Sequence, residues 1–273
     1  MLKNILKLAL LVGVTLGLVA CSGSEKPKDE VKKEESKKVI KVGATPVPHV
    51  EILEVVKPLL KAKGYELEIV EFTDYVTPNI AVDEGQLDAN FFQHMPYLNE
   101  FNKTKNTKLV KTVSVHLEPM GLYSKKIKSL DELEDGATIA VPNDPTNESR
   151  ALDILEKKGF LKFKEAQFKT ALDIIENPKN LKIKELDAPQ LPRVLDEVDA
   201  AIINTNYALS ADLNPIKDAL VLESKDSPYA NILVVREGNE DKDYIKALNE
   251  VLNSKEVKEF IASKYKGSIV EAF

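Results

Sequence analysis

The sequence contains a single cysteine, Cys21, among its 273 residues, and one thiol cannot form a disulfide within the chain. It also lacks a Gly-x-Ser-x-Gly motif, and no glycine-rich phosphate loop occurs among its 11 glycines. No arrangement for nucleophilic catalysis is therefore evident, and we expect a binding protein rather than an enzyme.

Positive charge is not in excess, because 38 Lys and Arg stand against 44 Asp and Glu and no net-basic block occurs. Nucleic acid is therefore not an expected partner. After residue 20 no apolar stretch approaches the roughly 18 to 20 residues of a membrane-spanning helix, which excludes a polytopic membrane protein. The 43% apolar content over this length excludes wholesale disorder and suffices for two domain-sized lobes.

The N-terminus has the pattern of a secretory signal, with Lys3 and Lys7 followed by an apolar segment over 8–20. The residues Leu-Val-Ala before Cys21 resemble the lipobox of bacterial lipoproteins, in which cleavage precedes a cysteine that carries lipid such as palmitate. We expect residues 1–20 to be a signal peptide and Cys21 to anchor the protein at the extracytoplasmic face of the cell membrane. The alternative is an ordinary signal peptide with an incidental cysteine.

The segment that follows Cys21 is almost entirely polar. Over 22–38, eleven of seventeen residues are charged, and Val31 is the only sizeable apolar side chain. Such a segment cannot bury a hydrophobic core, so we interpret 21–38 as the lipidated cysteine and a flexible linker.

From Val39 onward, short β-branched runs alternate with segments of helical periodicity, which predicts a parallel sheet with both faces covered. Pro58 is expected to kink or interrupt the first helix, and Gly64 to end it. The first series of predicted elements comprises strands at 39–44, 67–72 and 87–92 and helices at 50–63 and 78–84.

A second series lies between two long extended runs, 109–123 and 229–236. This arrangement predicts two α/β lobes joined by two crossing strands, with 39–118 and 230–273 in lobe I and 119–229 in lobe II. The predicted elements after residue 123 are strands at 138–141, 181–186 and 200–203 and helices at 146–158, 171–176, 241–253 and 255–265.

Seven blocks of sequence, spread over nearly the whole chain after the linker, resemble the methionine-binding lipoproteins of the MetQ/NlpA family, which are ABC transporter substrate-binding proteins. The resemblance implies a type II periplasmic-binding-protein-like fold of two α/β lobes with the ligand cleft between them. It also implies capture of L-methionine without a cofactor, and delivery to an ABC transporter permease and ATPase complex. The blocks are VGATPVPHVEIL (42–53), TDYVTPNIAVDEGQLDANFFQHMPYL (73–98), EPMGLYS (118–124), VPNDPTNESRAL (141–152), ENPKNLKIKELDAPQLPR (176–193), INTNYA (203–208) and SPYANILV (227–234).

An amino acid is a zwitterion, so a closed site must offer a cation to its carboxylate and acceptors to its ammonium. Of the three arginines, Arg150 lies in the first predicted helix of lobe II, and its planar guanidinium suits a carboxylate. The resemblance implies that Arg150 contacts the ligand carboxylate. The alternative is a surface arginine, and in an open cleft we expect its side chain to be hydrated.

Tyr75, Phe92 and His94 follow or end predicted strands of lobe I, where open α/β sheets place their ligands. Aromatic faces attract a thioether by about 0.3 to 1.5 kcal/mol, which suits methionine. Strand alternation predicts that one of Phe91 and Phe92 packs in the core, and the resemblance assigns Phe92 to the ligand. His94 could instead be a structural histidine.

Asn204 follows the strand at 200–203, and Asn231 lies in the extended run at 229–236. A side-chain amide can accept from an ammonium and donate to a carboxylate, although asparagine at a strand end is also an ordinary turn residue. The resemblance implies that both contact the ligand. Asn206 and Tyr207 are weaker candidates, and Asn147 could support the start of the Arg150 helix.

Other ligands remain open at this point. A methionine-containing dipeptide or another small amino acid would use the same kind of site. A zinc or manganese receptor would require the three histidines, His49, His94 and His116, to converge with a carboxylate such as Glu118. Their spacing shows no close ligand pattern, so we expect no metal.

Overall fold

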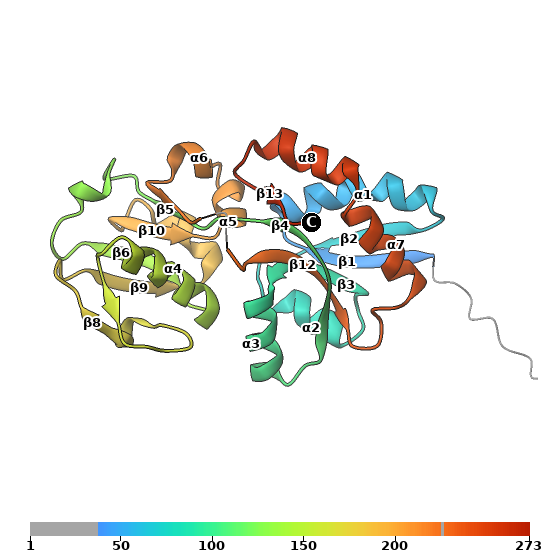
Figure 1. The fold of residues 1–273 in the computed structure, drawn as a ribbon, viewed down its shortest axis with the longest axis horizontal. Helices are drawn as coiled ribbons and strands as arrows, with labels where there is room; N and C mark the ends of the chain where they lie inside the picture. The colour runs from blue at the N-terminus through green and yellow to red at the C-terminus, as the bar shows by residue number, and fades with distance from the viewer. Residues whose placement is uncertain (1–37, 225–226) are drawn as a thin grey trace, which may run out of the picture. The chain divides into compact units, whose positions relative to one another are not determined.

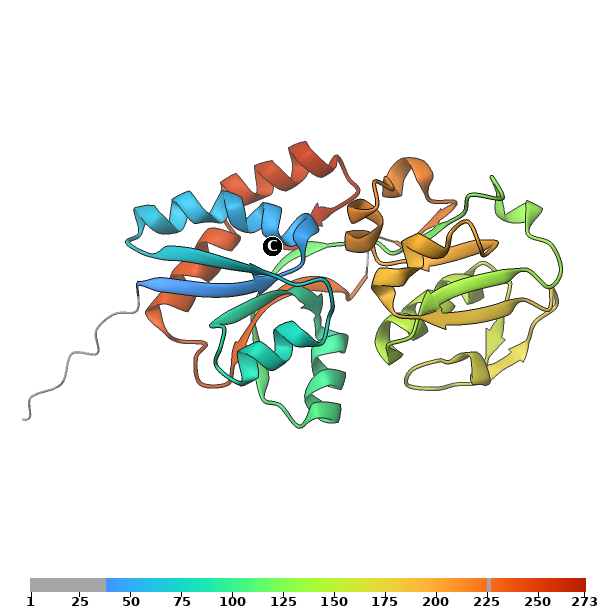
Figure 2. The same ribbon diagram turned by 180° about the vertical axis from the view of Figure 1, so that it is seen from behind.

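Two large β-sheets, each with helices on both faces, and a small two-stranded sheet make up the part of the chain that the structure describes (Figures 1 and 2). The structure is a computed structural model that describes residues 38–224 and 227–273. Residues 37–273 form one compact unit. The predicted signal peptide, Cys21 and all but the last residue of the predicted linker lie outside the described residues. We refer to the six-stranded sheet with its helices as the first lobe and to the five-stranded sheet with its helices as the second lobe.

The sheet of the first lobe is mixed, with the order β13-β4-β12-β3-β1-β2. β1 pairs in parallel with β2 and β3, as the alternation of strands and helices predicts. β12 lies antiparallel between β3 and β4, and β13 is antiparallel to β4. β4 and β12 come from the two predicted extended runs. The strands are β1 (Val39–Ala44), β2 (Glu66–Glu71), β3 (Ala89–His94), β4 (Leu109–Leu117), β12 (Ala230–Arg236) and β13 (Val270–Glu271).

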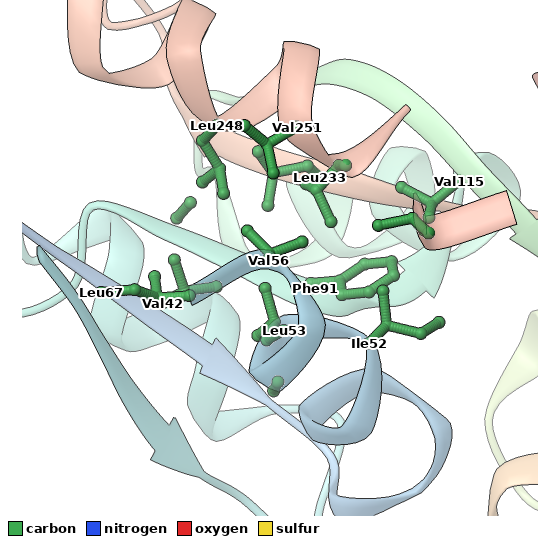
Figure 3. Packing of buried hydrophobic residues seen from close by; sticks show 14 of the residues in the cluster. Val42, Ile52, Leu53, Val56, Leu67, Phe91, Val115, Leu233, Leu248 and Val251 are labelled. Carbon is green, nitrogen blue, oxygen red and sulfur yellow. The ribbon is translucent and has the colours of Figure 1, made fainter. Parts of the chain in front are cut away.

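Helices cover both faces of this sheet, and alternate side chains of β12 show how. Leu233 and Val235 pack in a core with α1, α7 and α8, whereas Ile232 and Val234 pack in a second core with α2 and α3 (Figure 3 shows the first core). Each such side chain contributes about 1.5 to 3 kcal/mol when fully buried. The helices are α1 (Glu51–Ala62), α2 (Thr77–Asp83), α3 (Met95–Lys105), α7 (Asp243–Leu252) and α8 (Lys255–Tyr265).

The first helix departs from the prediction at Pro58. α1 is one uninterrupted helix from Glu51 to Ala62 that follows a π-helical turn, η1 (Pro46–Val50). Pro58 lies on its exposed face, where water can satisfy the backbone carbonyl that the proline leaves unbonded. Gly64, with φ +87°, ends the helix as predicted.

The sheet of the second lobe has the order β11-β5-β10-β6-β9 and is also mixed. Ile139 and Val141 of β6 pack with α4, whereas Ala140 faces the opposite core with η4 and α5. The elements are β5 (Gly121–Tyr123), β6 (Thr138–Pro142), β9 (Lys182–Leu186), β10 (Ala200–Ile203), β11 (Val221–Leu222), α4 (Pro145–Lys157), η4 (Ala188–Val194), α5 (Thr205–Ser210) and α6 (Pro215–Asp218).

The helix predicted over 171–176 is wrong. Only one 3₁₀ turn forms, η3 (Ala171–Asp173), and a capping box between Thr170 and Asp173 closes it. β8 (Ile174–Glu176) then pairs with β7 (Lys162–Phe163) in a two-stranded ribbon. Pairing with the preceding strand, β7, thus overrides the local helical pattern.

The chain passes between the two sheets twice. The predicted extended run over 109–123 is two strands, β4 in the first lobe and β5 in the second, and residues 118–120 connect them. The chain returns between β11 and β12. No helix among residues 38–224 and 227–273 is long and apolar enough to cross a membrane.

Candidate binding site

A cavity lies where the two lobes meet. All six residues predicted to bind the ligand line it, so segments that are far apart in the sequence converge on one space. The lining residues are Tyr75, Phe92, Gln93, His94, Tyr97, Glu118, Asn147, Arg150, Asn204, Thr205, Asn206 and Asn231.

An aromatic wall forms one side of the cavity. Tyr75 stacks on Phe92 with ring centroids 5.6 Å apart, and Tyr97 packs edge-on against both rings. Phe91 points the other way, into the core of the first lobe, as strand alternation predicts. The wall offers π-faces to an apolar or sulfur-containing side chain.

Arg150 supplies the cation, and its side chain is only 4% exposed. Its Nε and Nη2 donate to the Glu223 carboxylate, with the shortest contact at 2.5 Å, and Nη2 also donates to the Glu118 carbonyl at 2.7 Å. The guanidinium lies 4.2 Å over the Tyr229 ring. Within the described residues Nη1 makes no hydrogen bond, so this nitrogen remains available to a ligand.

Amide side chains surround the guanidinium. Asn147 Oδ1 accepts from Asn204 Nδ2 at 3.0 Å and lies 3.1 Å from His94 Nε2. Asp144 fixes the Asn147 amide by accepting from its Nδ2. Asn204 Oδ1 is buried and has no hydrogen-bond partner in the described part of the chain. A buried acceptor without a donor costs about 1 to 3 kcal/mol, which a ligand donor would remove.

His94 belongs to the first lobe and connects it to the second through Asn147. Its Nδ1 accepts from the Tyr97 backbone N–H, which caps α3. Burial and the nearby Arg150 charge lower the pKa of His94 to about 3, so the imidazole is neutral. His94 therefore has a structural role at the edge of the cavity as well as a lining role.

A buried polar cluster lies behind the cavity. The strand register aligns His94, Asn231 and His116 across β3, β12 and β4. Glu118 Oε1 lies 2.7 Å from His116 Nε2 and 3.2 Å from His49 Nε2, which is also 3.1 Å from Asn231 Oδ1. Because every neighbour of these two Nε2 atoms is an acceptor, both imidazoles donate from Nε2.

The electrostatics of this cluster follow from burial. Desolvation lowers the pKa of His49 to about 4 and that of His116 to about 3. Burial also raises the pKa of Glu118, against the opposing effects of His49, Arg150 and the Asn206 backbone N–H.

The three histidines do not converge on one point as a metal receptor would require, because His94 contacts Asn147. The nitrogen and oxygen atoms of His49, His116 and Glu118 lie within 4.8 Å of one another and already bond to each other.

Two tyrosines connect the lobes by hydrogen bonds. Tyr75 Oη donates to Asn206 Oδ1 at 2.6 Å, and Tyr207 Oη donates to the Thr73 carbonyl at 3.1 Å. Burial raises the pKa of both hydroxyls, so both remain protonated donors. Asn206 and Tyr207 thus form contacts between the lobes.

Several residues of the site were not predicted as ligand contacts. Tyr97 was missed together with α3, although the Met95-Pro96 pair after His94 is a recognisable helix start. Glu118 was considered only as a metal ligand. Glu223 and Tyr229, which hold Arg150, carry no local signal, because only the tertiary fold brings them to it.

Comparisons with known proteins agree with this architecture. The NlpA lipoprotein family model matches residues 40–273. The chain is 44% identical over 276 aligned residues to the D-methionine-binding lipoprotein MetQ of Salmonella typhi, covering 99% of this chain and 98% of that protein.

Solved structures are similar over most of the chain. A nutrient-binding protein from Burkholderia cenocepacia, bound to methionine, is 51% identical with a TM-score of 0.84, covering 86% of this chain and all of that one. Lipoprotein Tp32 from Treponema pallidum is 40% identical with a TM-score of 0.84, covering 87% and 100%. The fold is the type II periplasmic-binding-protein-like fold, two α/β lobes with the cleft between them, and the chain belongs to the NlpA lipoprotein family of substrate-binding transport proteins.

Proposed function

We propose that this protein captures methionine in the cleft between its lobes and delivers it to an ABC importer, without chemistry of its own. The observation that carries the proposal is the composition of the cavity between the lobes. It combines an aromatic wall with a buried arginine and buried acceptors, which together match an apolar side chain on a zwitterion. The methionine bound to the Burkholderia cenocepacia relative supports the same ligand class.

In this proposal Arg150 Nη1 donates to the ligand carboxylate, and Asn204 Oδ1 accepts from its ammonium. Tyr75, Phe92 and Tyr97 contact the thioether chain. His94 and Asn231 hold these groups in position through Asn147 and His49. A ligand that touches both lobes binds the closed state better than the open one, and this difference in affinity drives closure.

The membrane attachment belongs to the proposal as well. Cleavage before Cys21 and acylation of its thiol would hold the receptor at the extracytoplasmic face, and 22–38 would serve as the tether. The lobe boundaries at 118/119 and 229/230 also stay predictions. The membrane partners we propose are the permease and ATPase of the importer.

Mass spectrometry of the ligand released from freshly purified, denatured protein tests the proposal, together with thermal shifts for L-methionine, D-methionine and a Gly-Met dipeptide. At 100 times its dissociation constant a ligand stabilises the protein by about 2.7 kcal/mol. Both stereoisomers are included because curated relatives are named for the D-form. Stoichiometric zinc or manganese in the same sample, with no shift for any methionine compound, would reject the proposal.

A further inference from the structure

We propose that His49, His116 and Glu118 form a binding site for one divalent transition-metal ion, with Zn²⁺ as the best match. Two of the three histidines of the chain meet one carboxylate here, whereas His94 lies apart. The three residues come from η1, from β4 and from the position directly after β4. The site is therefore built on one side of the cleft, and it needs neither closure of the lobes nor a bound amino acid.

The first observation is the spacing of the donor atoms. One ligand atom from each residue lies within 4.8 Å of the other two. Glu118 Oε1 is 2.7 Å from His116 Nε2 and 3.2 Å from His49 Nε2. A tetrahedral zinc ion with bonds of about 2.0 to 2.1 Å separates its ligand atoms by about 3.3 to 3.4 Å. The three atoms are thus already close to the spacing that one zinc ion requires.

The second observation is the kind of ligand that the cluster offers. Imidazole nitrogen suits Zn²⁺, Cu²⁺ and Ni²⁺, whereas Mg²⁺ and Ca²⁺ prefer oxygen ligands. Arg150 already pairs with Glu223, so its guanidinium does not form an ion pair with the Glu118 carboxylate. Two imidazoles and one carboxylate therefore favour a transition metal over the hard divalent cations.

The third observation is that packing holds both imidazoles in place. Each ring meets the Phe91 ring edge-on, with centroids 4.7 Å apart for His49 and 5.3 Å apart for His116. The two imidazole centroids are 5.0 Å apart, and both side chains are almost fully buried. A metal ion would meet ligands that have already lost their rotamer freedom, which lowers the entropic cost of binding.

The opposite ring nitrogens can hold the protons that the metal displaces. In the hydrogen-bonded cluster both imidazoles carry their proton on Nε2, so a metal bond at Nε2 requires the proton on Nδ1. His49 Nδ1 lies 2.8 Å from the Thr45 hydroxyl, which can accept from it. His116 Nδ1 has no hydrogen-bond partner in the described part of the chain and so loses none. Thr45 would serve as the outer-shell partner that orients a ligating histidine.

The cavity gives a metal ion access to the cluster. Glu118 and Asn231 both line the cavity, and Asn231 Oδ1 is 3.1 Å from His49 Nε2. Three protein ligands leave the fourth position of a tetrahedral ion to a water molecule or to this amide oxygen. An ion can therefore enter from the cleft without disturbing the core behind the histidines.

Calorimetric titration of ZnCl₂ into metal-free, ligand-free protein tests the site, with Cys21→Ser in every sample so that the thiol binds no zinc. One Zn²⁺ per chain should bind, and MgCl₂ should not compete. His116→Gln keeps an amide donor for Glu118 but removes the imidazole, so its zinc affinity should fall about 100-fold or more. Loss of an outer-shell partner alone costs about 10- to 100-fold, and loss of a ligand costs more. His94→Gln is the matched control for zinc affinity, because His94 lies outside the cluster.

Equal zinc affinity in His116→Gln and the parent, or Mg²⁺ bound as tightly as Zn²⁺, would overturn the inference. Should His116→Gln not fold, parent crystals soaked in ZnCl₂ decide by anomalous scattering. A peak between the His49, His116 and Glu118 side chains supports the inference, and no peak there overturns it. Titration of the metal-free parent with L-methionine tests the proposed function separately, so each of the two can fail without the other.

Discussion

Replacing Arg150 by alanine should damage both the fold and the site, because the arginine is paired inside the protein. Its partner Glu223 has a side chain only 8% exposed and accepts from both Nε and Nη2. Removing one member of a buried ion pair costs about 3 to 5 kcal/mol, since the other charge stays buried. The cation–π contact with Tyr229 adds about 0.5 to 2 kcal/mol. Against a typical total of about 5 to 15 kcal/mol, Arg150→Ala is expected to be folded but marginal.

Arg150 is buried and paired with Glu223 in this structure, so affinity alone cannot assign it to the ligand. Arg150→Lys keeps a charge for Glu223 but loses the fork of two donors, which makes it the more informative variant. Urea unfolding without ligand measures the structural loss, and calorimetry at low temperature measures binding of L-methionine and of L-methioninamide, which has no carboxylate.

If Nη1 binds the carboxylate, both Arg150 variants should lose more affinity for L-methionine than for L-methioninamide, by about tenfold or more in Arg150→Ala, which corresponds to about 1.4 kcal/mol. Of the two ligands only L-methionine has a carboxylate, and in the variants this carboxylate loses its buried cation. A loss of equal size for both ligands would make Arg150 a purely structural residue and refute the reasoning.

Three further predictions concern the anchor, the histidine and the aromatic wall. Cys21→Ser should abolish partitioning into the detergent phase and leave methionine affinity unchanged; a serine variant that still partitions like the parent would contradict the anchor. The folded pKa of His94 is about 3 against 6.5 unfolded, so the unfolded chain binds the extra proton and stability is lost as pH falls from 6.5 toward 3. In urea unfolding at pH 7, 6 and 5, His94→Asn should lack this loss, which is about 1.4 kcal/mol of unfolding free energy per pH unit. Parallel profiles for the variant and the parent would contradict the lowered pKa of His94. Norleucine should shift the melting temperature less than methionine, because a methylene replaces the polarisable sulfur beside Tyr75 and Phe92; an equal shift would reject the thioether contact.

Local periodicity predicted most of the secondary structure and the convergence of the site. Strands and helices in the first lobe follow the apolar pattern, and alternation along β3 separates Phe91 in the core from Phe92 at the cavity. The carboxyl ends of parallel strands meet at one edge of a sheet, so residues such as His94 and Asn204, far apart in sequence, come together for a topological reason.

What the sequence does not reveal depends on long-range pairing. The ribbon of β7 and β8 overrode a helical pattern, and the pairing of Arg150 with Glu223 spans 73 residues without any local mark. The register that aligns His116 with Asn231 likewise exists only once β12 has joined the sheet. Glu118 therefore has no sequence signature as a cavity residue, because its partners come from separate elements.

The contacts between the lobes explain how such a site can discriminate ligands by closing. These contacts join protein groups of the two lobes directly: His94 with Asn147, Tyr75 with Asn206, and Tyr207 with Thr73. Closure without a ligand would also bury the Asn204 Oδ1 acceptor without a partner, at a cost of about 1 to 3 kcal/mol. A ligand with an ammonium removes this cost, whereas one that lacks the ammonium leaves it in place. Selectivity then lies in the free energy of closing, so an incomplete ligand should bind more weakly even where its side chain fits the aromatic wall equally well.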